Sequence, residues 1–370
     1  MDLSDRDGTS ARSLEDLLDS WDGEATVVRR ARSADALIVV AVHSTVLGPS
    51  AGGCRMRSYG STADAVHDAH RLSSAMTWKF AACGLPFGGG KSVISVPSLP
   101  QGDDRRALLR EFGELVESLG GLYITAPDMN TSDLDMDVVG ERTSHVFCRT
   151  EEAGGCGSPA PATADGVEAG MRAAMGHVFG SDDPRGRTVL VQGVGAVGAR
   201  LARRLAADGA KLVVCDLDES RATRLADEIG ARVIPADSWA TEECDVLAPC
   251  AAGGVLDPST IDLLRCRLVA GAANNQLRTA ADAARLAGRG ITWVPDYVLN
   301  AGGVLKGMGM ELLGWSPEQV QERIRRIGDD VAEILALADR DGRTPFQVAE
   351  DRAGARIAAA ARSEDRAPTS

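Results

Sequence analysis

Apolar and polar residues follow two different periods in the first part of the chain. Between residues 62 and 82, apolar positions such as Val66, Ala69 and Leu72 recur at spacings of three and four, which predicts one long helix. Residues 105–119 show the same period and predict a second helix. Short apolar runs predict strands at residues 25–28, 37–42, 92–96 and 122–125. The mixture indicates an α/β domain.

A second α/β pattern follows the Gly- and Pro-rich segment 154–161, which is typical of a linker. After a helix expected at 163–179, strands at 188–192, 211–216, 233, 245–248, 268–271 and 292–294 alternate with helices. Such alternation is typical of a mostly parallel sheet. Two amphipathic helices are expected beyond Pro317 and at 345–361, and the ends 1–12 and 363–370 are polar.

Composition and charge narrow the function classes. The 370 residues carry 40 basic and 53 acidic side chains, a net charge of −13, so a nonspecific nucleic-acid binder is disfavoured. The apolar run 36–42 is too short to cross a bilayer, and the acidic N-terminus lacks the basic part of a signal peptide. We therefore expect a cytoplasmic protein without a membrane partner. Eight dispersed cysteines without a CxxC pair indicate reduced thiols.

Lysine is scarce in this chain, which makes each lysine informative. Only four of the 40 basic residues are lysines, and Lys79 and Lys91 both lie in an apolar, glycine-rich stretch. An amine there can lose its proton, whereas a guanidinium stays charged. Gly88 to Gly90 precede Lys91, and we expect them to bring backbone close to a ligand, exclude water and favour a catalytic amine of lowered pKa. The alternatives are a surface lysine or a phosphate loop, for which Leu85 replaces the first glycine.

Two further polar positions have both a functional and a structural interpretation. Asp128 follows the strand expected at 122–125, at a strand end where carboxylates often act, and is equally compatible with an Asx turn or a helix cap. His67 and His70 fall on one helix face at a metal-like spacing. No third ligand is suggested, so we expect no metal site.

A dinucleotide-binding motif opens the second sheet. Gly193, Gly195 and Gly198 have GxGxxG spacing directly after an apolar strand and before a helix, and Asp216 ends the next strand. The glycines permit a tight turn, the approach of a pyrophosphate to helix N–H groups, and close helix packing. Asp216 can accept a hydrogen bond from a ribose 2′-hydroxyl and would repel a 2′-phosphate, so NAD is favoured over NADP. The expected cofactor contacts are Gly193, Gly195, Ala196, Val197, Gly198 and Asp216.

Seven motifs occur in an order that resembles the Glu/Leu/Phe/Val dehydrogenase superfamily. They are AGGCRM (51–56), MTWK (76–79), LPFGGGK (85–91), PDMNT (127–131), GVGAVG (193–198), GAANNQL (271–277) and NAGG (300–303). Among the branches of the superfamily, the chain looks most similar to the phenylalanine dehydrogenases, through PDMNT, LAPCAAGGV (247–255), GAANN and ELLGW (311–315). The resemblance implies an α/β substrate-binding and oligomerisation domain at 1–153 and an NAD-binding Rossmann domain at 154–316. It also implies C-terminal helices at 317–362 that pack back on the first domain, a tail at 363–370, and a homo-oligomer.

The same resemblance assigns the chemistry. Lys79 matches the lysine that pairs with the substrate α-carboxylate, and Lys91 the neutral lysine that activates the water attacking the imino acid. Asp128 matches the carboxylate that exchanges protons with the amino group and the carbinolamine. The implied reaction is the reversible, NAD-dependent conversion of an L-amino acid to its 2-oxo acid and ammonium. Further implied contacts are Gly52, Gly53, Met76, Asn274, Val304 and Gly307 for the substrate, and Asn274 and Asn300 for the cofactor.

We expect the substrate side chain to be apolar. Glutamate-specific members place a lysine before the GG pair, where this chain has Ala51, so an acidic side chain would be buried without a partner. Val304 is bulkier than the alanine of some phenylalanine-specific members, whereas Gly307 leaves depth for a ring. We therefore expect L-phenylalanine, with leucine or valine second and tryptophan third. A non-catalytic NAD-binding regulator would need the glycine motif but not the two lysines and the aspartate together.

Overall fold

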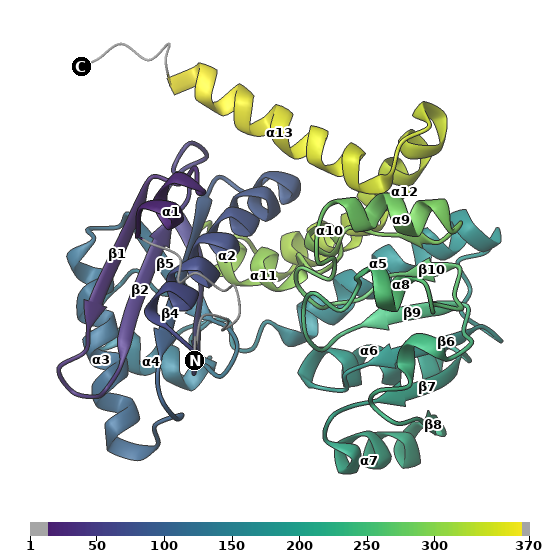
Figure 1. Cartoon of the computed structure of the whole chain (residues 1–370), viewed down its shortest axis with the longest axis horizontal. Helices are drawn as coiled ribbons and strands as arrows, with labels where there is room; N and C mark the ends of the chain where they lie inside the picture. Colours follow the sequence, from purple (N-terminus) through teal and green to yellow (C-terminus); the bar gives the residue numbers. More distant parts are fainter. Residues whose placement is uncertain (1–13, 365–370) are drawn as a thin grey trace, which may run out of the picture. The chain divides into compact units, whose positions relative to one another are not determined.

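The computed structural model describes residues 14–364, which form two compact units (Figure 1). Unit 1 contains the described residues up to Thr77 together with Pro86–Arg149. Unit 2 contains Trp78–Leu85 and the described residues from Thr150 onward. The polar ends expected at 1–12 and 365–370 lie outside the described residues. Residues 363 and 364, expected in the tail, form the end of the last helix.

Unit 1 is built on a five-stranded mixed sheet of order β1-β2-β4-β3-β5. β3 runs parallel to both β4 and β5, whereas β1 and β2 pair antiparallel with their neighbours. The strands are β1 (Ala25–Arg30), β2 (Leu37–Val42), β3 (Ser50–Arg57), β4 (Gly88–Ser95) and β5 (Tyr123–Pro127). The helices are α1 (Leu14–Asp19), α2 (Thr62–Cys83), α3 (Gly102–Ser118) and α4 (Asp133–Gly140), and α2 ends in unit 2.

Both faces of this sheet are covered. The alternating residues Ile38 and Val40 of β2 pack in a core with residues of α3 and α4, such as Phe112. The intervening Val39 and Ala41 pack in a second core with residues of α1 and α2. A strand that is buried on both faces becomes continuously apolar, which is why the run 37–42 was recognisable in the sequence.

Two strands of unit 1 contain glycines, which have low strand propensity, and were therefore not fully predicted from the sequence. β3 contains the AGGCRM segment and was not expected as a strand, and β4 begins at Gly88 rather than at residue 92. Glycine normally weakens a strand. Here it is required by close approach, because a Cβ on Gly52 would lie 1.8 Å from the carbonyl oxygen of Gly90 on the neighbouring strand.

Unit 2 contains a six-stranded, fully parallel sheet of order β11-β10-β9-β6-β7-β8. The strands are β6 (Thr188–Gln192), β7 (Lys211–Cys215), β8 (Arg232–Val233), β9 (Val246–Pro249), β10 (Leu268–Val269) and β11 (Thr292–Trp293). The longer helices are α5 (Ala160–Phe179), α6 (Ala196–Ala207), α7 (Glu219–Ile229), α9 (Ala281–Gly288), α11 (Gly302–Glu311), α12 (Pro317–Asp341) and α13 (Pro345–Glu364). Two shorter helices are α8 (Pro258–Ile261) and α10 (Asp296–Leu299).

The strand order places β6 and β9 side by side at the centre of this sheet, which is the doubly wound arrangement expected from the alternating pattern. The predicted two-domain α/β fold with terminal helices is confirmed. α12 packs along α5, and its start is capped by Ser316, which accepts from the Gln319 backbone N–H. None of the helices within residues 14–364 is long and apolar enough to span a membrane. All eight cysteines are free thiols.

Candidate active site

Lys91 and Asp128 form a buried ion pair in unit 1. Lys91 lies on β4 with 5% of its surface exposed, and its Nζ is 3.0 Å from Oδ2 of Asp128, in the loop after β5. Because β3 lies between β4 and β5 in the sheet, the two residues approach each other over β3. The alternative of a surface lysine is therefore excluded for Lys91. The pair places two titratable groups in direct contact at a buried position. Such an arrangement is typical of groups that transfer protons.

The loop after β5 aims Asp128 at Lys91 rather than at the next helix. Ser132 caps α4, with its hydroxyl accepting from the Asp135 backbone N–H, so Asp128 is not the helix cap. The backbone N–H of Asp128 donates to Oγ1 of Thr131 at 2.8 Å. A Cβ on Gly53 would lie 2.8 Å from Cβ of Asp128, so glycine at this position of β3 makes room for the carboxylate.

Burial and two cations act in opposite directions on the Asp128 carboxyl group. Burial raises its pKa, but the charges of Lys91 and Arg55 and their hydrogen bonds outweigh burial and lower the pKa to about 2. Asp128 is therefore ionised at neutral pH. Arg55 on β3 donates from Nε to Oδ2 of Asp128 at 3.0 Å. The sequence interpretation missed Arg55, although it lies inside the AGGCRM segment.

The glycines before Lys91 serve close packing within the protein. A Cβ on Gly88 would meet the carbonyl of Ser44 at 1.8 Å, and one on Gly90 would meet the Tyr123 ring at 2.7 Å. We expected these glycines to bring the backbone close to a ligand. The space that a Cβ on Gly88 or Gly90 would occupy is instead filled by protein atoms. The phosphate-loop alternative loses support, because Gly88–Gly90 are strand residues paired with β2 and β3.

Lys79 belongs to the last turn of α2, in the part of that helix that lies in unit 2. It is buried, and its Nζ donates to Oδ1 of Asn300 at 2.7 Å. Asn300 in turn donates from Nδ2 to Oδ1 of Asn274 at 2.8 Å and to the carbonyl of Ala272 at 3.1 Å. The structure therefore brings together three residues that the sequence analysis selected from three separate motifs.

Asp296 is a second residue that the sequence analysis missed. It is buried, and its Oδ2 accepts from the Asn275 backbone N–H at 2.6 Å. Asn275 has a φ of 52°, in the left-handed region, so this hydrogen bond holds a strained turn next to Asn274. Burial raises the pKa of Asp296 to about 6, against the lowering effects of this hydrogen bond and of the Lys79 charge. A DY pair four residues before NAGG carries no motif signal that could have identified it.

The glycine-rich turn between β6 and α6 fits a dinucleotide. Gly193 has a φ of 93°, and a Cβ on Gly198 would lie 2.0 Å from the Gly193 carbonyl oxygen, so both are needed for the tight turn. Gly195 is the N-cap of α6, no side chain caps it, and a Cβ there would meet nothing within 4 Å. The helix N-terminus is thus open to a pyrophosphate. Asp216 accepts from the backbone N–H groups of Val194 and Asp218 at 2.8 and 2.9 Å.

The remaining selected residues take places compatible with binding or with structure. Met76, half-buried on α2, lies with its Cγ 3.4 Å from where a Gly52 Cβ would be. Val304 is half-buried and Gly307 buried on α11. The ring of His70 stacks on that of Trp21 with 3.8 Å between the ring centroids, and burial is the main cause that lowers the pKa of His70 to about 4.

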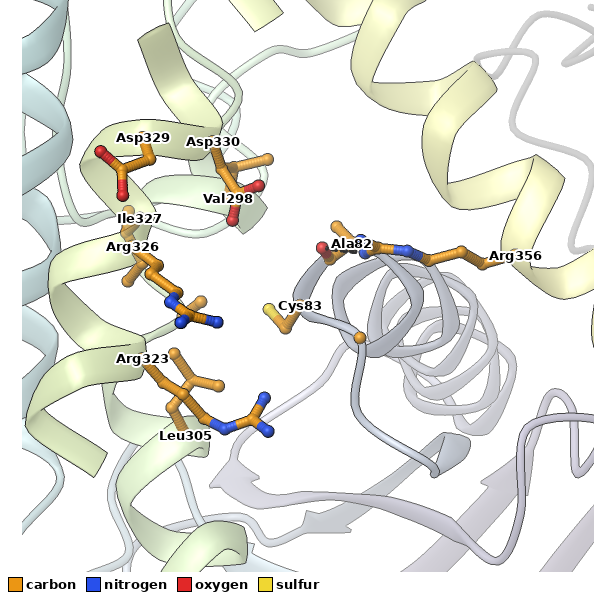
Figure 2. A pocket seen from close by; sticks show the side chains of 12 residues that line it. Ala82, Cys83, Val298, Leu305, Arg323, Arg326, Ile327, Asp329, Asp330 and Arg356 are labelled. Carbon is orange, nitrogen blue, oxygen red and sulfur yellow. Dashed lines mark hydrogen bonds between the residues drawn. The ribbon is translucent and has the colours of Figure 1, made fainter. Parts of the chain in front are cut away.

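A cavity of about 290 Å³ lies in unit 2 beside the end of α2 (Figure 2). It is lined by Ala82–Gly84 at the end of α2, by residues of α10, α11 and α12, and by Arg356 of α13. Each of its three arginines has a partner within the chain. The partners are the Trp315 ring for Arg323, Glu322 for Arg326, and the carbonyls of Ala81 and Ala82 for Arg356. The hydrogen bonds of Arg356 therefore connect the end of α2 with α13.

Family comparisons match most of the chain. Residues 31–145 match the Glu/Leu/Phe/Val dehydrogenase dimerisation domain, and residues 214–365 match Glutamate/Leucine/Phenylalanine/Valine dehydrogenase. A leucine dehydrogenase of Thermoactinomyces intermedius is 40% identical over 337 residues, which cover 91% of each chain. A phenylalanine dehydrogenase of Bacillus thermotolerans is 38% identical over 326 residues, 87% of this chain and 85% of the relative.

A solved structure extends the likeness to three dimensions. The crystal structure of L-tryptophan dehydrogenase from Nostoc punctiforme superimposes with a TM-score of 0.75 at 33% identity, covering 94% of this chain and 100% of that one. The three relatives are named for three different apolar amino acids. Overall identity therefore does not separate branched-chain from aromatic substrates.

Proposed function

Since the chain belongs to the Glu/Leu/Phe/Val dehydrogenase family and is an amino acid dehydrogenase, we propose that it catalyses the NAD-dependent oxidative deamination of an apolar L-amino acid. The products are the 2-oxo acid, ammonium, NADH and a proton. L-phenylalanine is the substrate that we favour. The observation that carries the proposal is the buried pair of Lys91 and Asp128, with 3.0 Å between Nζ and Oδ2.

The chain's own residues supply the binding and proton-transfer steps. Lys79 binds the substrate carboxylate as an ammonium, and its hydrogen bond to Asn300 orients it. Asp128 takes a proton from the substrate ammonium, which gives the neutral amine from which a hydride can leave. Unprotonated Lys91 then takes a proton from the water that attacks the imino carbon. Asp128 returns its proton to the amino group of the carbinolamine and takes the hydroxyl proton as the C–N bond breaks, which leaves the 2-oxo acid and ammonia.

The residues of the glycine-rich turn would hold NAD. Backbone N–H groups at the open N-terminus of α6 suit the pyrophosphate, and the Asp216 carboxylate at the end of β7 suits a ribose hydroxyl. A 2′-phosphate beside the Asp216 carboxylate would place like charges together, which favours NAD over NADP. When bound, NAD supplies the nicotinamide ring that accepts the hydride from Cα.

Three residues bear on which amino acid is the substrate. Ala51 is buried in β3 and offers no charge to an acidic side chain, which argues against glutamate. We expect Gly307, which has no side chain, to leave volume for a ring, which favours phenylalanine. The branched Val304 and the 40% identity to a leucine dehydrogenase favour leucine or valine as the second candidate. One methylene in such a pocket discriminates by only about 10- to 200-fold, so activity on several apolar amino acids is expected.

The direct test is a substrate panel on the purified protein with NAD⁺ or NADP⁺, followed by NADH or NADPH absorbance. The panel contains Phe, Tyr, Trp, Leu, Val and Glu. The proposal expects turnover of the apolar amino acids with NAD⁺, the highest kcat/KM for Phe, and none for Glu. A clear lead for Leu or Val would overturn the aromatic choice alone, whereas no turnover of any apolar amino acid would overturn the proposed reaction.

We also propose that the protein assembles as a homo-oligomer through unit 1. The support is the match of residues 31–145 to a domain described as a dimerisation domain. Light scattering during size-exclusion chromatography measures the mass directly. A mass equal to one chain at micromolar concentration would contradict this.

A further inference from the structure

Arg55 is held at both ends of its guanidinium group by carboxylates of unit 1. Its side chain is 12% exposed. Nε donates to Oδ2 of Asp128 at 3.0 Å, and Nη1 donates to Oδ2 of Asp68 on α2 at 3.1 Å. A planar guanidinium with two such contacts has little freedom to rotate.

Asp68 is itself fixed, so the arginine is anchored to a rigid point. Its Oδ2 accepts from the hydroxyl of Tyr59 at 2.7 Å, and its Oδ1 accepts from Nη2 of Arg71 at 2.8 Å. Burial raises the pKa of Asp68, but these hydrogen bonds and the charges of Arg55 and Arg71 lower it overall. The anchor is therefore ionised at neutral pH. The path from Asp68 through Arg55 to Asp128 connects α2 with the loop after β5 by charge-assisted hydrogen bonds.

Both cations that contact Asp128 act on the same oxygen. The Nε of Arg55 and the Nζ of Lys91 each lie 3.0 Å from Oδ2. Oδ1 is thereby left for a third donor. A carboxylate gripped at one oxygen has a defined orientation, so the other oxygen points in a reproducible direction.

We propose that Arg55 is a positioning residue for Asp128, which holds Oδ2 so that Oδ1 meets the substrate amino group, and which keeps the carboxylate compensated while Lys91 is unprotonated. This inference rests on the proposed function. The family resemblance implied no role for Arg55. In this proposal Arg55 contacts neither the substrate nor the cofactor and acts through Asp128.

The need for a second cation follows from the proton transfers. Lys91 must lose its proton before it can accept one from water. If Lys91 were the only partner of Asp128, that loss would leave a buried carboxylate without a compensating charge, which is strongly unfavourable. A guanidinium does not deprotonate in this range, so Arg55 supplies a permanent charge.

The other titratable groups around the pair stay neutral over the working pH range. Burial is the largest cause that raises the pKa of the Cys54 thiol, to about 12, and burial likewise raises the pKa of the Tyr123 hydroxyl; both face Asp128 from β3 and β5. Burial also raises the pKa of Tyr59, next to Asp68. The charged group of unit 1 that acts with Lys91 on the Asp128 carboxylate is thus Arg55, and Asp68 holds Arg55 in place.

The test compares Arg55→Gln, Arg55→Lys and the control Arg71→Gln with the wild type, over pH, with the amino acid that the wild type oxidises best. Arg71 is a matched control because it contacts Asp68 but not Asp128, and its side chain is 46% exposed. In Arg55→Gln we expect kcat to fall about 10- to 100-fold while KM for the amino acid changes about twofold or less. Removal of a cation favours the protonated forms of Lys91 and Asp128, so the acid limb of kcat/KM moves up by about one pH unit.

The two remaining variants separate charge from orientation. Arg55→Lys keeps the positive charge and should return the acid limb to its wild-type position. It should still lower kcat about 3- to 10-fold, because one ammonium group cannot replace the two fixed N–H donors of the guanidinium. Arg71→Gln should keep kcat within about twofold of wild type. If Arg55→Gln fails to fold, the lowered kcat of Arg55→Lys at an unchanged acid limb is the decisive result.

Wild-type kcat and an unshifted acid limb in Arg55→Gln would overturn the positioning role and leave the proposed reaction intact. An inactive wild type would instead overturn the proposed function.

Discussion

Lys79 donates a hydrogen bond from Nζ to Oδ1 of Asn300 at 2.7 Å, although 221 positions separate the two residues in the chain. The contact joins the end of α2 to the segment before α11. It orients the buried ammonium group of Lys79. A carboxylate is the acceptor that suits such a cation best.

Lys79→Ala should therefore chiefly weaken amino acid binding. The lost contact is present in the ground state and in the transition state, so KM should rise about tenfold or more with a smaller change in kcat. Steady-state kinetics with the amino acid varied at saturating NAD⁺ measure both constants. The control is Lys211→Ala, which removes an exposed lysine at the start of β7. An unchanged KM in Lys79→Ala would place the carboxylate site elsewhere.

Asp216 should set the cofactor preference. Its carboxylate also accepts from the Val194 backbone N–H, so Asp216→Ala removes both the charge and a contact that holds the glycine-rich turn. Asp216→Asn keeps an acceptor oxygen without the charge and is the better test. We expect the ratio of kcat/KM for NAD⁺ to that for NADP⁺ to narrow about tenfold in Asp216→Asn. Equal use of both cofactors by the wild type would contradict the role of Asp216.

Asp296 makes the stability of unit 2 depend on pH. Its pKa is raised by burial to about 6 in the folded chain, above the ordinary value of 3.8 for aspartate. The folded state therefore favours the protonated form, and the stability due to this group is present below pH 3.8 and lost as pH rises toward 6. Asp296→Asn keeps an acceptor for the Asn275 N–H and removes the buried charge.

Thermal unfolding of wild type and Asp296→Asn across this range checks the sign. The variant should gain melting temperature relative to wild type as pH rises through the interval, by a few degrees at neutral pH. If the difference in melting temperature between the two proteins does not change with pH, Asp296 does not titrate in this pH interval.

The sequence predicted the unit 2 sheet and singled out Lys79 and Lys91 for physical reasons that are local. Short runs with an apolar centre and turn residues on both sides, such as residues 188–192, are typical of buried strands, and the GxGxxG spacing fits one kind of turn. Lysine was informative because it is rare here. The same reasoning treated arginine as a generic charge, and so Arg55 was overlooked among 36 arginines. Its role depends on the parallel pairing of β3 with β4 and β5, which no local pattern encodes.

The glycines of β3 and β4 show why the remainder was not predictable. These glycines are required because a neighbouring strand lies close to them: a Cβ on Gly52 would collide with the backbone of Gly90. Propensity marks such residues as turn formers, and only the register of the sheet shows that they are strand residues. Asp296 was missed for a similar reason, since the N–H that it accepts from belongs to a turn 21 positions earlier.

Val304 should tune the choice between aromatic and branched substrates. Val304→Ala removes two methyl groups from the expected pocket wall on α11 and makes room for a ring. The ratio of kcat/KM for Phe to that for Leu should rise about tenfold or more. Competition between the two amino acids in one reaction, followed by quantification of the 2-oxo acids, measures this ratio. A fall in the ratio would show that Val304 does not face the substrate side chain.

The proton-transfer role of the Lys91 and Asp128 pair is the centre of this account. Its most direct test is the kcat of Asp128→Asn and Lys91→Ala for oxidation of the best amino acid, measured beside NADH binding by fluorescence titration. We expect kcat to fall by about 10² or more in each variant while the Kd for NADH stays within about twofold of wild type, because acid–base groups contribute about 10²- to 10⁴-fold. A near-normal kcat in either variant would contradict the account.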